Sequence, residues 1–295
     1  MNVGSNSCPM KNEILVTGAT GFLGRFLVAA LESEGHSVRR HSSADGDIAV
    51  CSLPMEGVSH VFHLAAKSYV PESWGNPRDY YQTNVIGTVN VLEHCRQNHA
   101  ALTFISTYVY GEPQRLPIVE DHPVSALNPY THTKILAEDA ARFYEKRFDI
   151  PLLIVRPFNI YGPGQRPSFL IPWIVQQVLD PSAEVVHVQN LRPKRDYLYV
   201  EDAVEFLLAA FRADAHGVFN MGSGRSASVE EIAQLVNKAA GLSKPVVSAG
   251  HTRPGEVMDM VADTAHAFAE LGWRPRTSLE DGIAAVVAAK RASRG

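Results

Sequence analysis

Tyr130 and Lys134 are the residues whose types and spacing most directly indicate chemistry. Side chains four residues apart on a helix lie one turn above each other on the same face. A phenol is normally too weak an acid to exchange protons near pH 7, but a neighbouring ammonium stabilises the phenolate and brings its pKa toward that range. The pair is therefore a candidate proton donor and acceptor. Such pairs also occur by chance, so the interpretation depends on the surrounding elements.

A glycine-rich turn between a strand and a helix is the first of those elements. Glu13 to Thr17 is a short apolar run with β character, and the residues from Phe26 onward have helical spacing that Gly35 ends as a C-cap. Glycines let the backbone approach a pyrophosphate, and the helix N-terminus offers it unpaired N–H groups. A tight turn without a ligand is the alternative. We expect a dinucleotide at this turn, which comprises Gly18, Thr20, Gly21, Phe22, Leu23 and Gly24.

The end of the second strand, Ser37 to His41, bears on the choice of cofactor. Many dinucleotide-binding units present an acidic side chain there to the ribose 2′-hydroxyl, but here the register gives Ser42. Arg39 and Arg40 precede this serine and Ser43 follows it. Arginines attract the additional charge of a 2′-phosphate, whereas a carboxylate would repel it. The segment therefore favours NADP.

NAD remains open, because the two arginines could be solvated at the strand edge while Asp45 folds back onto the ribose. Asp47 and Ile48, at the start of an expected short strand, are candidate contacts for the adenine.

Two further strands are expected to lead to the same cleft. Val58 to Ala66 resembles a buried strand whose small final residues let the backbone lie against a cofactor. A helix from about Asn84 to Asn98 follows, and Ala101 to Ser106 is the next expected strand. That strand delivers Ser106 and Thr107 to its carboxyl end, where ligands bind in parallel α/β sheets. A hydroxyl there can bind a substrate oxygen or simply cap the turn.

Composition indicates a globular chain with a small-molecule partner. With 295 residues, 45% of them hydrophobic, the chain can bury a sizeable core. A formal net charge of −4 gives no long-range attraction to nucleic acid or to an anionic membrane, so neither is expected as a partner. Three widely spaced cysteines, Cys8, Cys51 and Cys95, indicate free thiols in the cytoplasm. We expect neither a secretion signal nor a membrane span.

Histidine pairs give no metal site. His60 and His63, or His94 and His99, lack cysteine or carboxylate partners at ligand spacing, so strand core and helix surface are the expected roles.

Taken together, the motifs resemble the extended short-chain dehydrogenase/reductases that act on nucleotide-diphosphate sugars. The resemblance covers nearly the whole chain. It is carried by GATGFLG at 18–24, HLAA at 63–66, STYVYG at 106–111, Tyr130 with Lys134, RPFNIYGPGQ at 156–165, RDYLYVED at 195–202, and RPGE at 253–256 followed by Leu271, Gly272 and Trp273.

The resemblance implies a Rossmann-type α/β fold, a doubly wound parallel sheet with a smaller C-terminal α/β substrate-binding lobe. The dinucleotide-binding domain would comprise residues 11–165 plus about 195–215. The NDP-sugar-binding lobe would comprise 166–194 and 216–295, and residues 1–10 would form a flexible tail. Family members pair through the helices near 84–98 and 130–147, which implies a homodimer.

The resemblance also assigns roles. Tyr130 would be the acid/base, Lys134 would bind the nicotinamide ribose and tune Tyr130, and Ser106 would hydrogen-bond the reacting C4 oxygen, with Thr107 as a possible substitute. The remaining cofactor contacts would be Leu64, Ala65, Ala66, Lys67 and Pro157. The positions matching the family's substrate contacts are Ser68, Ser106, Thr107, Asn159, Arg195 and Arg253.

Several residues of the substrate end have two interpretations. Ile171 and Pro172 would either wall the nucleobase or belong to the core. Arg195 would contact substrate or form a buried salt bridge with Asp196. Arg156, beside a proline at a strand end, is expected to have a cofactor-side or structural role.

Three reactions of the family, and one alternative outside catalysis, must be separated. A 4,6-dehydratase would carry an Asp-Glu pair where this chain has Thr107 and Tyr108, so dehydration is set aside. The absent acidic residue after the second strand favours an NADPH-dependent 4-ketoreductase, and the segment Asn190 to Tyr197 resembles that of GDP-4-keto-6-deoxymannose reductases more than that of UDP-sugar 4-epimerases. An NAD-dependent 4-epimerase is the alternative. A regulator that has lost catalysis is a second alternative, which the intact Ser106, Tyr130 and Lys134 oppose.

Overall fold

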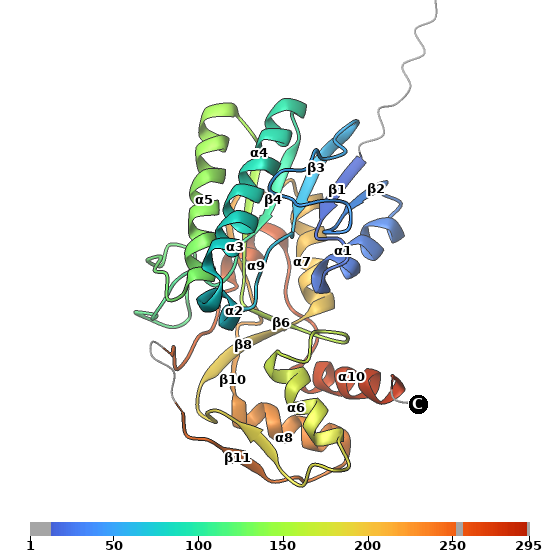
Figure 1. The fold of residues 1–295 in the computed structure, drawn as a ribbon, viewed down its shortest axis with the longest axis vertical. Coiled ribbons are helices and arrows are strands. Elements are labelled where there is room, and N and C mark those ends of the chain that lie inside the picture. The colour runs from blue at the N-terminus through green and yellow to red at the C-terminus, as the bar shows by residue number, and fades with distance from the viewer. Residues whose placement is uncertain (1–12, 252–255, 294–295) are drawn as a thin grey trace, which may run out of the picture. The chain divides into compact units, whose positions relative to one another are not determined.

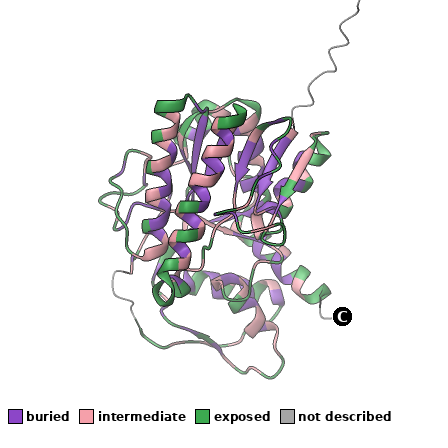
Figure 2. Ribbon diagram, turned by 45° about the horizontal axis from the view of Figure 1, so that its top comes forward, coloured by how far each residue is buried: buried purple, intermediate pink, exposed green. Residues whose placement is uncertain are grey.

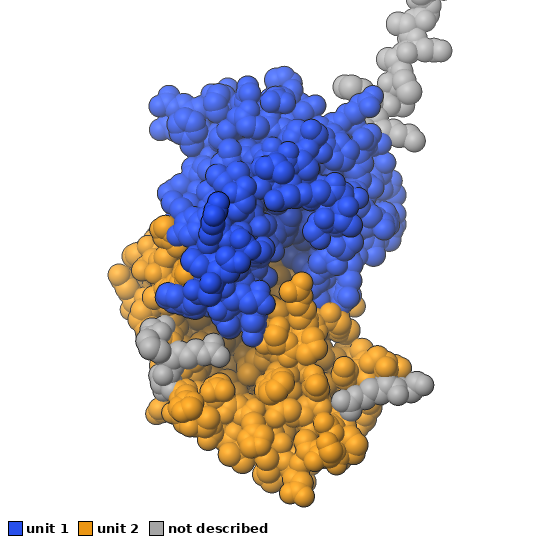
Figure 3. Space-filling model, in the orientation of Figure 1, with its two compact units in different colours: residues 1–105, 133–154 blue, residues 106–132, 155–295 orange. Residues whose placement is uncertain are grey.

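The computed structural model describes residues 13–251 and 256–293 of the chain as a mixed α/β protein (Figure 1). The chain divides into two compact units, Met1–Ile105 with Thr133–Ile154 and Ser106–His132 with Val155–Gly295 (Figure 3). The sequence boundaries instead group residues 106–132 and 155–165 with the dinucleotide-binding domain, and that division stays a prediction. The expected tail of residues 1–10 lies outside the described residues.

A six-stranded sheet has the strand order β2-β1-β3-β4-β5-β9. β1 pairs in parallel with β2 and β3, and β3 pairs in parallel with β4. The central strands β1, β3, β4 and β5 are mostly buried (Figure 2), because a parallel sheet covered on both faces requires nearly continuous apolar runs, whereas β2 at the edge buries only His41. The predicted Rossmann-type parallel sheet is confirmed. Its strands are β1 (Glu13–Thr17), β2 (Val38–His41), β3 (Val58–His63), β4 (Ala101–Ile105), β5 (Leu152–Pro157) and β9 (Gly217–Met221).

Helices follow the strands of the first unit much as the sequence predicts. The first helix begins at Phe22, earlier than expected, so Leu23 and Gly24 belong to its first turn. The expected helix at 84–98 begins with a π-helical turn. Two short helices before it were not expected. The elements are α1 (Phe22–Ser33), α2 (Val70–Gly75), α3 (Pro77–Tyr81), η1 (Gln82–Ile86), α4 (Gly87–Asn98) and α5 (Pro129–Phe148).

Two expected strand boundaries were wrong. β3 ends at His63, and the Ala65 N–H turns away from the ladder to donate to the Thr17 hydroxyl at 3.3 Å. Asp47 and Ile48 open a turn, since the Asp47 carbonyl accepts the Cys51 N–H at 2.8 Å. Both segments look apolar enough for strands, but hydrogen bonds to distant or local partners replace the ladder bonds.

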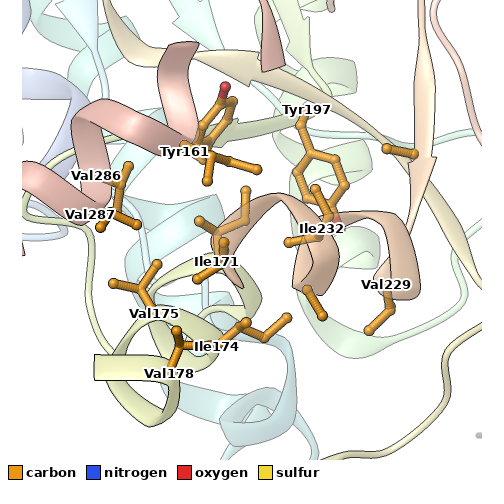
Figure 4. Packing of buried hydrophobic residues seen from close by; sticks show 14 of the residues in the cluster. Tyr161, Ile171, Ile174, Val175, Val178, Tyr197, Val229, Ile232, Val286 and Val287 are labelled. Atoms are coloured by element: carbon orange, nitrogen blue, oxygen red, sulfur yellow. The ribbon is translucent and has the colours of Figure 1, made fainter. Parts of the chain in front are cut away.

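The second unit has its own apolar core (Figure 4). Ile171 and Val175 of α6 pack there with Ile232 of α8 and with Val286 and Val287 of α10. The unit also contains a three-stranded sheet, β10-β8-β6, and a two-stranded sheet, β11-β7. Its remaining elements are β6 (Asn159–Tyr161), α6 (Leu170–Leu179), β7 (Val186–Val188), β8 (Lys194–Tyr199), α7 (Val200–Arg212), β10 (Ser226–Ser228), α8 (Val229–Ala240), β11 (Val246–Ser248), α9 (Ala265–Leu271) and α10 (Leu279–Ala292).

None of the helices in the described residues is long and apolar enough to cross a membrane. Cys51 and Cys95 are free thiols, and Cys8 lies outside the described residues.

Candidate functional site

The glycine turn after β1 is packed too tightly for side chains. Gly18 has φ +69°, and a Cβ added there would lie 2.8 Å from the backbone nitrogen of Ala65. A Cβ on Gly24 would lie 2.2 Å from the Gly18 carbonyl oxygen. Gly21 is the N-cap of α1, whose first turn contains no acidic residue and receives no hydrogen bond from a capping side chain. The turn therefore fits an anionic pyrophosphate, with exposed Thr20 and half-buried Phe22 and Leu23 beside it.

The two arginines of β2 are both paired within the protein. Arg39 binds the carboxylate of Glu13, and Arg40 donates to Glu32 at 2.6 Å. The sequence favoured these guanidinium groups for a 2′-phosphate, but the paired glutamates neutralise them locally. These partners lie 26 and 8 residues away, so the β2 segment alone gives no sign of them.

Asp45, in the turn that follows β2, places an exposed carboxylate near the end of this strand. Its carboxylate accepts hydrogen bonds from the Ser42 N–H and the Ser42 hydroxyl, each at 2.8 Å. These bonds hold the pKa of Asp45 below its usual range. Ser43 lies exposed in the same turn. An exposed carboxylate beside the end of the second strand is the feature that the predicted NAD alternative requires.

The turn that contains Asp47 and Ile48 packs on the start of α4. The Asp47 carboxylate accepts the Ala49 N–H at 3.0 Å. Ile48 is buried, and its Cγ2 would lie 2.7 Å from a Cβ added at Gly87. The turn leaves the Asp47 side chain exposed. A contact with adenine stays a prediction for both residues.

Asn84 holds the loop that follows β3. Its amide oxygen accepts the Lys67 N–H at 2.8 Å, and its amide nitrogen donates to the Lys67 carbonyl at 3.0 Å. The same nitrogen donates to the Thr133 hydroxyl at 2.9 Å. Asn84 thus joins the loop of Leu64, Ala65, Ala66, Lys67 and Ser68 to the residue that precedes Lys134. The sequence interpretation missed this role, because nothing local marks an asparagine near a helix start as buried.

The histidines of β3 are held by threonines. His63 lies between the Thr17 hydroxyl at 2.7 Å and the Thr88 hydroxyl at 3.1 Å, and burial lowers its pKa to about 3. Burial lowers the pKa of His60, which contacts Thr103 at 2.8 Å, to about 4. Across residues 13–251 and 256–293, no three His, Cys, Asp or Glu side chains are grouped as for a metal ion.

Lys134 is a buried cation on α5, one turn after Tyr130. Its side chain is only 2% exposed, and its Nζ lies 4.1 Å from the centroid of the Phe104 ring. Burial lowers the pKa of Lys134 to about 7, although the carboxylate of Glu138 acts in the opposite direction. Asn128 begins this helix by accepting the Thr131 N–H at 2.8 Å. Half-buried Tyr130 therefore sits in the first turn of α5, four residues before an ammonium that a neighbouring anion would stabilise.

Ser106 follows β4 directly, so the strand ends at Ile105, one residue before the predicted end. It is buried, and its N–H donates to the Val155 carbonyl at 2.8 Å. Thr107 is half-buried beside it. The Tyr108 hydroxyl donates to the Gly111 carbonyl at 2.6 Å, and burial raises the pKa of Tyr108. Neither Thr107 nor Tyr108 supplies a carboxylate at this strand end.

Asp196 is a buried hydrogen-bond acceptor of the second unit. Its buried carboxylate accepts the Ser223 N–H and hydroxyl, each at 2.6 Å, and the N–H groups of Gly224 and Ala262 at 3.0 and 3.1 Å. Burial raises the pKa of Asp196 despite these donors. The guanidinium of Arg195 donates to the Val257 carbonyl at 2.7 Å. The Asp196 carboxylate therefore attaches β8 to two loop segments, one at Ser223 and Gly224 and the other at Ala262.

Two further predicted substrate residues lie near Asp196, and one cannot be placed. Asn159 donates to the Asp196 carbonyl at 3.2 Å and is half-buried. Arg195 is half-buried on β8. Arg253 lies outside the described residues.

Of the two predicted nucleobase residues, Ile171 belongs to the core and Pro172 borders a cavity. Ile171 is 2% exposed within the cluster of Figure 4. Pro172 lines a cavity of about 200 Å³ together with Gln165 and Lys290. Ile171 follows the core alternative because α6 directs it toward α8 and α10. Pro157, a predicted cofactor contact, is buried at the end of β5.

Trp273, the last residue of the motif that begins at Leu271, forms a structural contact with α7. The indole N–H of Trp273 donates to the Asp202 carbonyl at 3.2 Å, and the Asp202 carboxylate accepts the N–H groups of Arg276 and Thr277 at 3.0 and 2.9 Å. These bonds attach the segment between α9 and α10 to the start of α7.

Comparisons with known proteins identify the family of this chain. Residues 53–286 match the family described as GDP-mannose 4,6 dehydratase. A UDP-glucose 4-epimerase from Pisum sativum is 29% identical in an alignment 325 positions long, which covers 91% of this chain and 93% of the relative. The structure of MoeE5 in complex with UDP-glucuronic acid and NAD is 31% identical with a TM-score of 0.87 and covers 95% of this chain and 99% of that one. RMD from Pseudomonas aeruginosa, complexed with NADPH, is 26% identical with a TM-score of 0.88, and the match covers 96% and 99% of the two chains.

Proposed function

We propose, from the premise that this chain belongs to the GDP-mannose 4,6-dehydratase family of extended short-chain dehydrogenase/reductases, that it is an NAD-dependent 4-epimerase of a nucleotide-diphosphate hexose. The observation that carries the proposal is the end of β2, where Arg39 and Arg40 are paired with glutamates and Asp45 closes on Ser42. An exposed carboxylate there favours a ribose 2′-hydroxyl and repels a 2′-phosphate. An epimerase retains its cofactor and needs no external reductant, so NAD suits it.

The relatives also favour epimerisation over the NADPH-dependent 4-ketoreduction that the sequence placed first. The pea relative is named as a UDP-glucose 4-epimerase, and MoeE5 is complexed with NAD. The NADPH-dependent 4-ketoreductase is the second candidate, because RMD, which this chain also resembles, is complexed with NADPH. The intact Ser106, Tyr130 and Lys134 oppose the alternative of a regulator without catalysis.

The proposed mechanism assigns the proton to Tyr130. A nicotinamide held beside the glycine turn of Gly18 to Gly24 would supply the hydride acceptor and donor for sugar C4. As the C4–H bond breaks, the Tyr130 phenolate takes the C4 hydroxyl proton, and it gives the proton back when the carbonyl is reduced. The ammonium of Lys134 stabilises the phenolate, and the Ser106 hydroxyl donates a hydrogen bond to the C4 oxygen. Thr107 is the substitute donor.

The diphosphate contacts are assigned to polar side chains of the second unit. We assign Asn159, Arg195 and Arg253 to the diphosphate and Ser68 to the sugar, following the positions of the family. The Arg195 guanidinium is held in place by hydrogen bonds to the carbonyls of Lys194 at 2.8 Å and Val257 at 2.7 Å. Pro172 is retained as a wall of the nucleobase site, and Ile171 is not.

We further propose that the chain forms a homodimer through α4 and α5. Phe143 is 56% exposed and Phe148 is 43% exposed on α5, and Ile86 at the start of α4 is also exposed. The guanidinium of Arg96 lies 5.3 Å from the Phe148 ring centroid, so the exposed aromatic edge continues from one helix to the other. Large exposed aromatic side chains grouped on adjacent helices are typical of a subunit interface.

One experiment separates the candidate functions. The purified protein is denatured, and the nucleotide that it releases is identified by mass spectrometry. The protein is then offered UDP-, GDP- and dTDP-hexoses with and without a 4-keto group. Released NAD and interconversion of two hexoses, without net change in nicotinamide absorbance, are expected. Steady NADPH consumption with a 4-keto sugar would instead establish the reductase.

A further inference from the structure

The segment between Ser106 and Tyr130 carries a proposed catalytic group at each end but has almost no secondary structure of its own. Residues 107–128 contain no helix, and the pairing of Ile118 with Ala262 is an isolated bridge. A connection of this length within a compact unit depends on tertiary hydrogen bonds for its conformation. Side chains of other elements must therefore hold residues 107–128 in place.

The Tyr110 hydroxyl is the centre of a buried hydrogen-bond network in this segment. It accepts a hydrogen bond from Arg156 Nη1 at 3.0 Å and donates to Asn220 Oδ1 at 2.5 Å. The Arg156 guanidinium also lies over the Tyr110 ring, 5.0 Å from its centroid. All three residues are buried, and the side chain of Arg156 is only 3% exposed. Tyr110 thereby links the segment to β5 and to β9 at once.

Two more points of the segment attach to the same residues. The Asn220 amide nitrogen donates to the Ile118 carbonyl at 2.9 Å, and its backbone N–H donates to the Glu120 carboxylate at 2.8 Å. Arg156 Nη1 donates in addition to the Glu120 carbonyl at 3.1 Å. The network therefore fixes the segment at residues 110, 118 and 120, between its two ends.

The network contains one cationic and one anionic side chain. Arg156 brings a buried guanidinium, and the Glu120 carboxylate brings the opposite charge, with His266 3.6 Å from that carboxylate. A buried network whose donors and acceptors are matched is rigid, because any displacement leaves a polar group unsatisfied in a low dielectric. A rigid connection keeps its ends at a constant separation.

We propose that Tyr110, Arg156, Asn220 and Glu120 are positioning residues, which set the separation of Ser106 and Tyr130 by clamping the segment that joins them. They contact neither the sugar nor the nicotinamide in this proposal. Their effect is on the chemical step, because a misplacement of about 1 Å costs a large factor in rate while ground-state binding is little changed. The catalytic part of the proposal rests on the proposed epimerase function, whereas the clamping of the segment does not.

The test uses Tyr110→Phe, which removes one hydroxyl and leaves the ring in place. Tyr161→Phe is the matched control, because Tyr161 is also buried, and its hydroxyl donates to the Leu279 carbonyl in the core of the second unit. For Tyr110→Phe we expect kcat to fall by about 10- to 100-fold while KM and NAD affinity stay within about twofold. For Tyr161→Phe, kcat should stay within about twofold.

Hydrogen exchange supplies a readout that does not need turnover. The Ile118 N–H donates to the Val261 carbonyl, and the Ser125 N–H donates to the Val109 carbonyl, at 2.8 and 2.9 Å. Both amides should exchange about tenfold faster or more in Tyr110→Phe than in the wild type or the control variant. The double variant Tyr110→Phe with Arg156→Lys should lose little more activity than Tyr110→Phe alone, because the two residues act as one unit.

The outcomes distinguish the two proposals. Unchanged exchange at Ile118 and Ser125 in Tyr110→Phe overturns the clamp, whatever the activity. Faster exchange with unchanged kcat overturns the catalytic role of the clamp. A wild type that converts no nucleotide sugar overturns the proposed function, and the exchange comparison still decides whether the network holds the segment.

Discussion

The ammonium of Lys134 lies 4.1 Å from the centroid of the Phe104 ring, in a site that leaves 2% of the lysine exposed. Phe104 belongs to β4, so the first turns of α5 pack a cation directly against the sheet. The aromatic face compensates part of the lost hydration, but burial still lowers the pKa of Lys134 to about 7. Burial of the charged Lys134 side chain therefore destabilises the cofactor-free protein, and a bound anion beside the ammonium would offset this cost.

Replacing Lys134 should change how stability depends on pH. The folded-state pKa of about 7 lies below the ordinary lysine value of 10.5, so the unfolded chain binds more protons between these two values. Stability of the cofactor-free wild type relative to Lys134→Met should thus rise between pH 7 and about pH 10, by roughly 1 kcal/mol per pH unit. Urea unfolding at pH 7 and pH 9.5 measures this. Exposed Lys238→Met is the control, and an unchanged difference between the two pH values would refute the expectation.

Tyr130→Phe should abolish turnover while leaving cofactor binding within about twofold. The loss in kcat is expected to be about 100- to 10,000-fold, because only the proton-transferring hydroxyl is removed. Steady-state kinetics and NAD titration check the two parts. Tyr144→Phe removes a hydroxyl near the other end of α5, where it donates to Glu93 at 2.5 Å, and should keep full activity. Turnover that survives in Tyr130→Phe would exclude the proposed mechanism.

Asp45→Asn should reduce the factor by which the protein binds NAD more tightly than NADP. Removing the carboxylate removes its repulsion of a 2′-phosphate, so the ratio of the two dissociation constants should shift by about fivefold, or roughly 1 kcal/mol. Asp180→Asn is a matched control, because Asp180 accepts the N–H and hydroxyl of Ser182 in the same way. Calorimetric titrations with both cofactors measure the ratio. If the wild type binds NADP more tightly than NAD, the assignment of Asp45 is wrong.

Phe143→Glu should convert the proposed dimer to a monomer. A charge in the centre of an apolar interface between two copies would be buried without a partner, at a cost of several kcal/mol. Sedimentation velocity at micromolar concentration gives the oligomeric state. Phe268→Glu changes a comparably exposed phenylalanine of the second unit and should leave the dimer intact. A wild type that sediments as a monomer would contradict the proposed interface.

The buried histidines of β3 should make the protein sensitive to acid. Their folded-state pKa values of about 4 for His60 and 3 for His63 lie below the ordinary 6.5, so unfolding takes up protons as the pH falls below 6.5. Wild-type stability should decrease from pH 6.5 toward pH 4, and His60→Gln should reduce the slope by up to about 1 kcal/mol per pH unit. Urea unfolding across this range tests the slope, with exposed His216→Gln expected to leave it unchanged.

The sequence by itself determined the elements whose bounds depend on neighbouring residues, such as an apolar run or a helix cap. β1 and α8 have the predicted bounds, since one is an apolar run stopped by glycine and the other begins at Ser228 with a capping box to Glu231. Tyr130 and Lys134 lie on one helix, as their spacing together with the surrounding motifs predicted. Boundaries failed where a hydrogen bond to a distant residue replaced a ladder bond, as at Ala65.

Only the tertiary structure decided which partner each polar side chain has. The sequence around Arg39 predicts a phosphate contact, but in the sheet its guanidinium binds Glu13, which is 26 residues distant in the sequence. Asn84, Tyr110 and Arg156 received no catalytic assignment from the sequence, because their partners lie 17 to 110 residues distant. Periodicity and turn chemistry act over a few residues and so can be read directly. Burial and hydrogen-bond pairing depend on which segments the fold brings together, and that information is distributed over the whole chain.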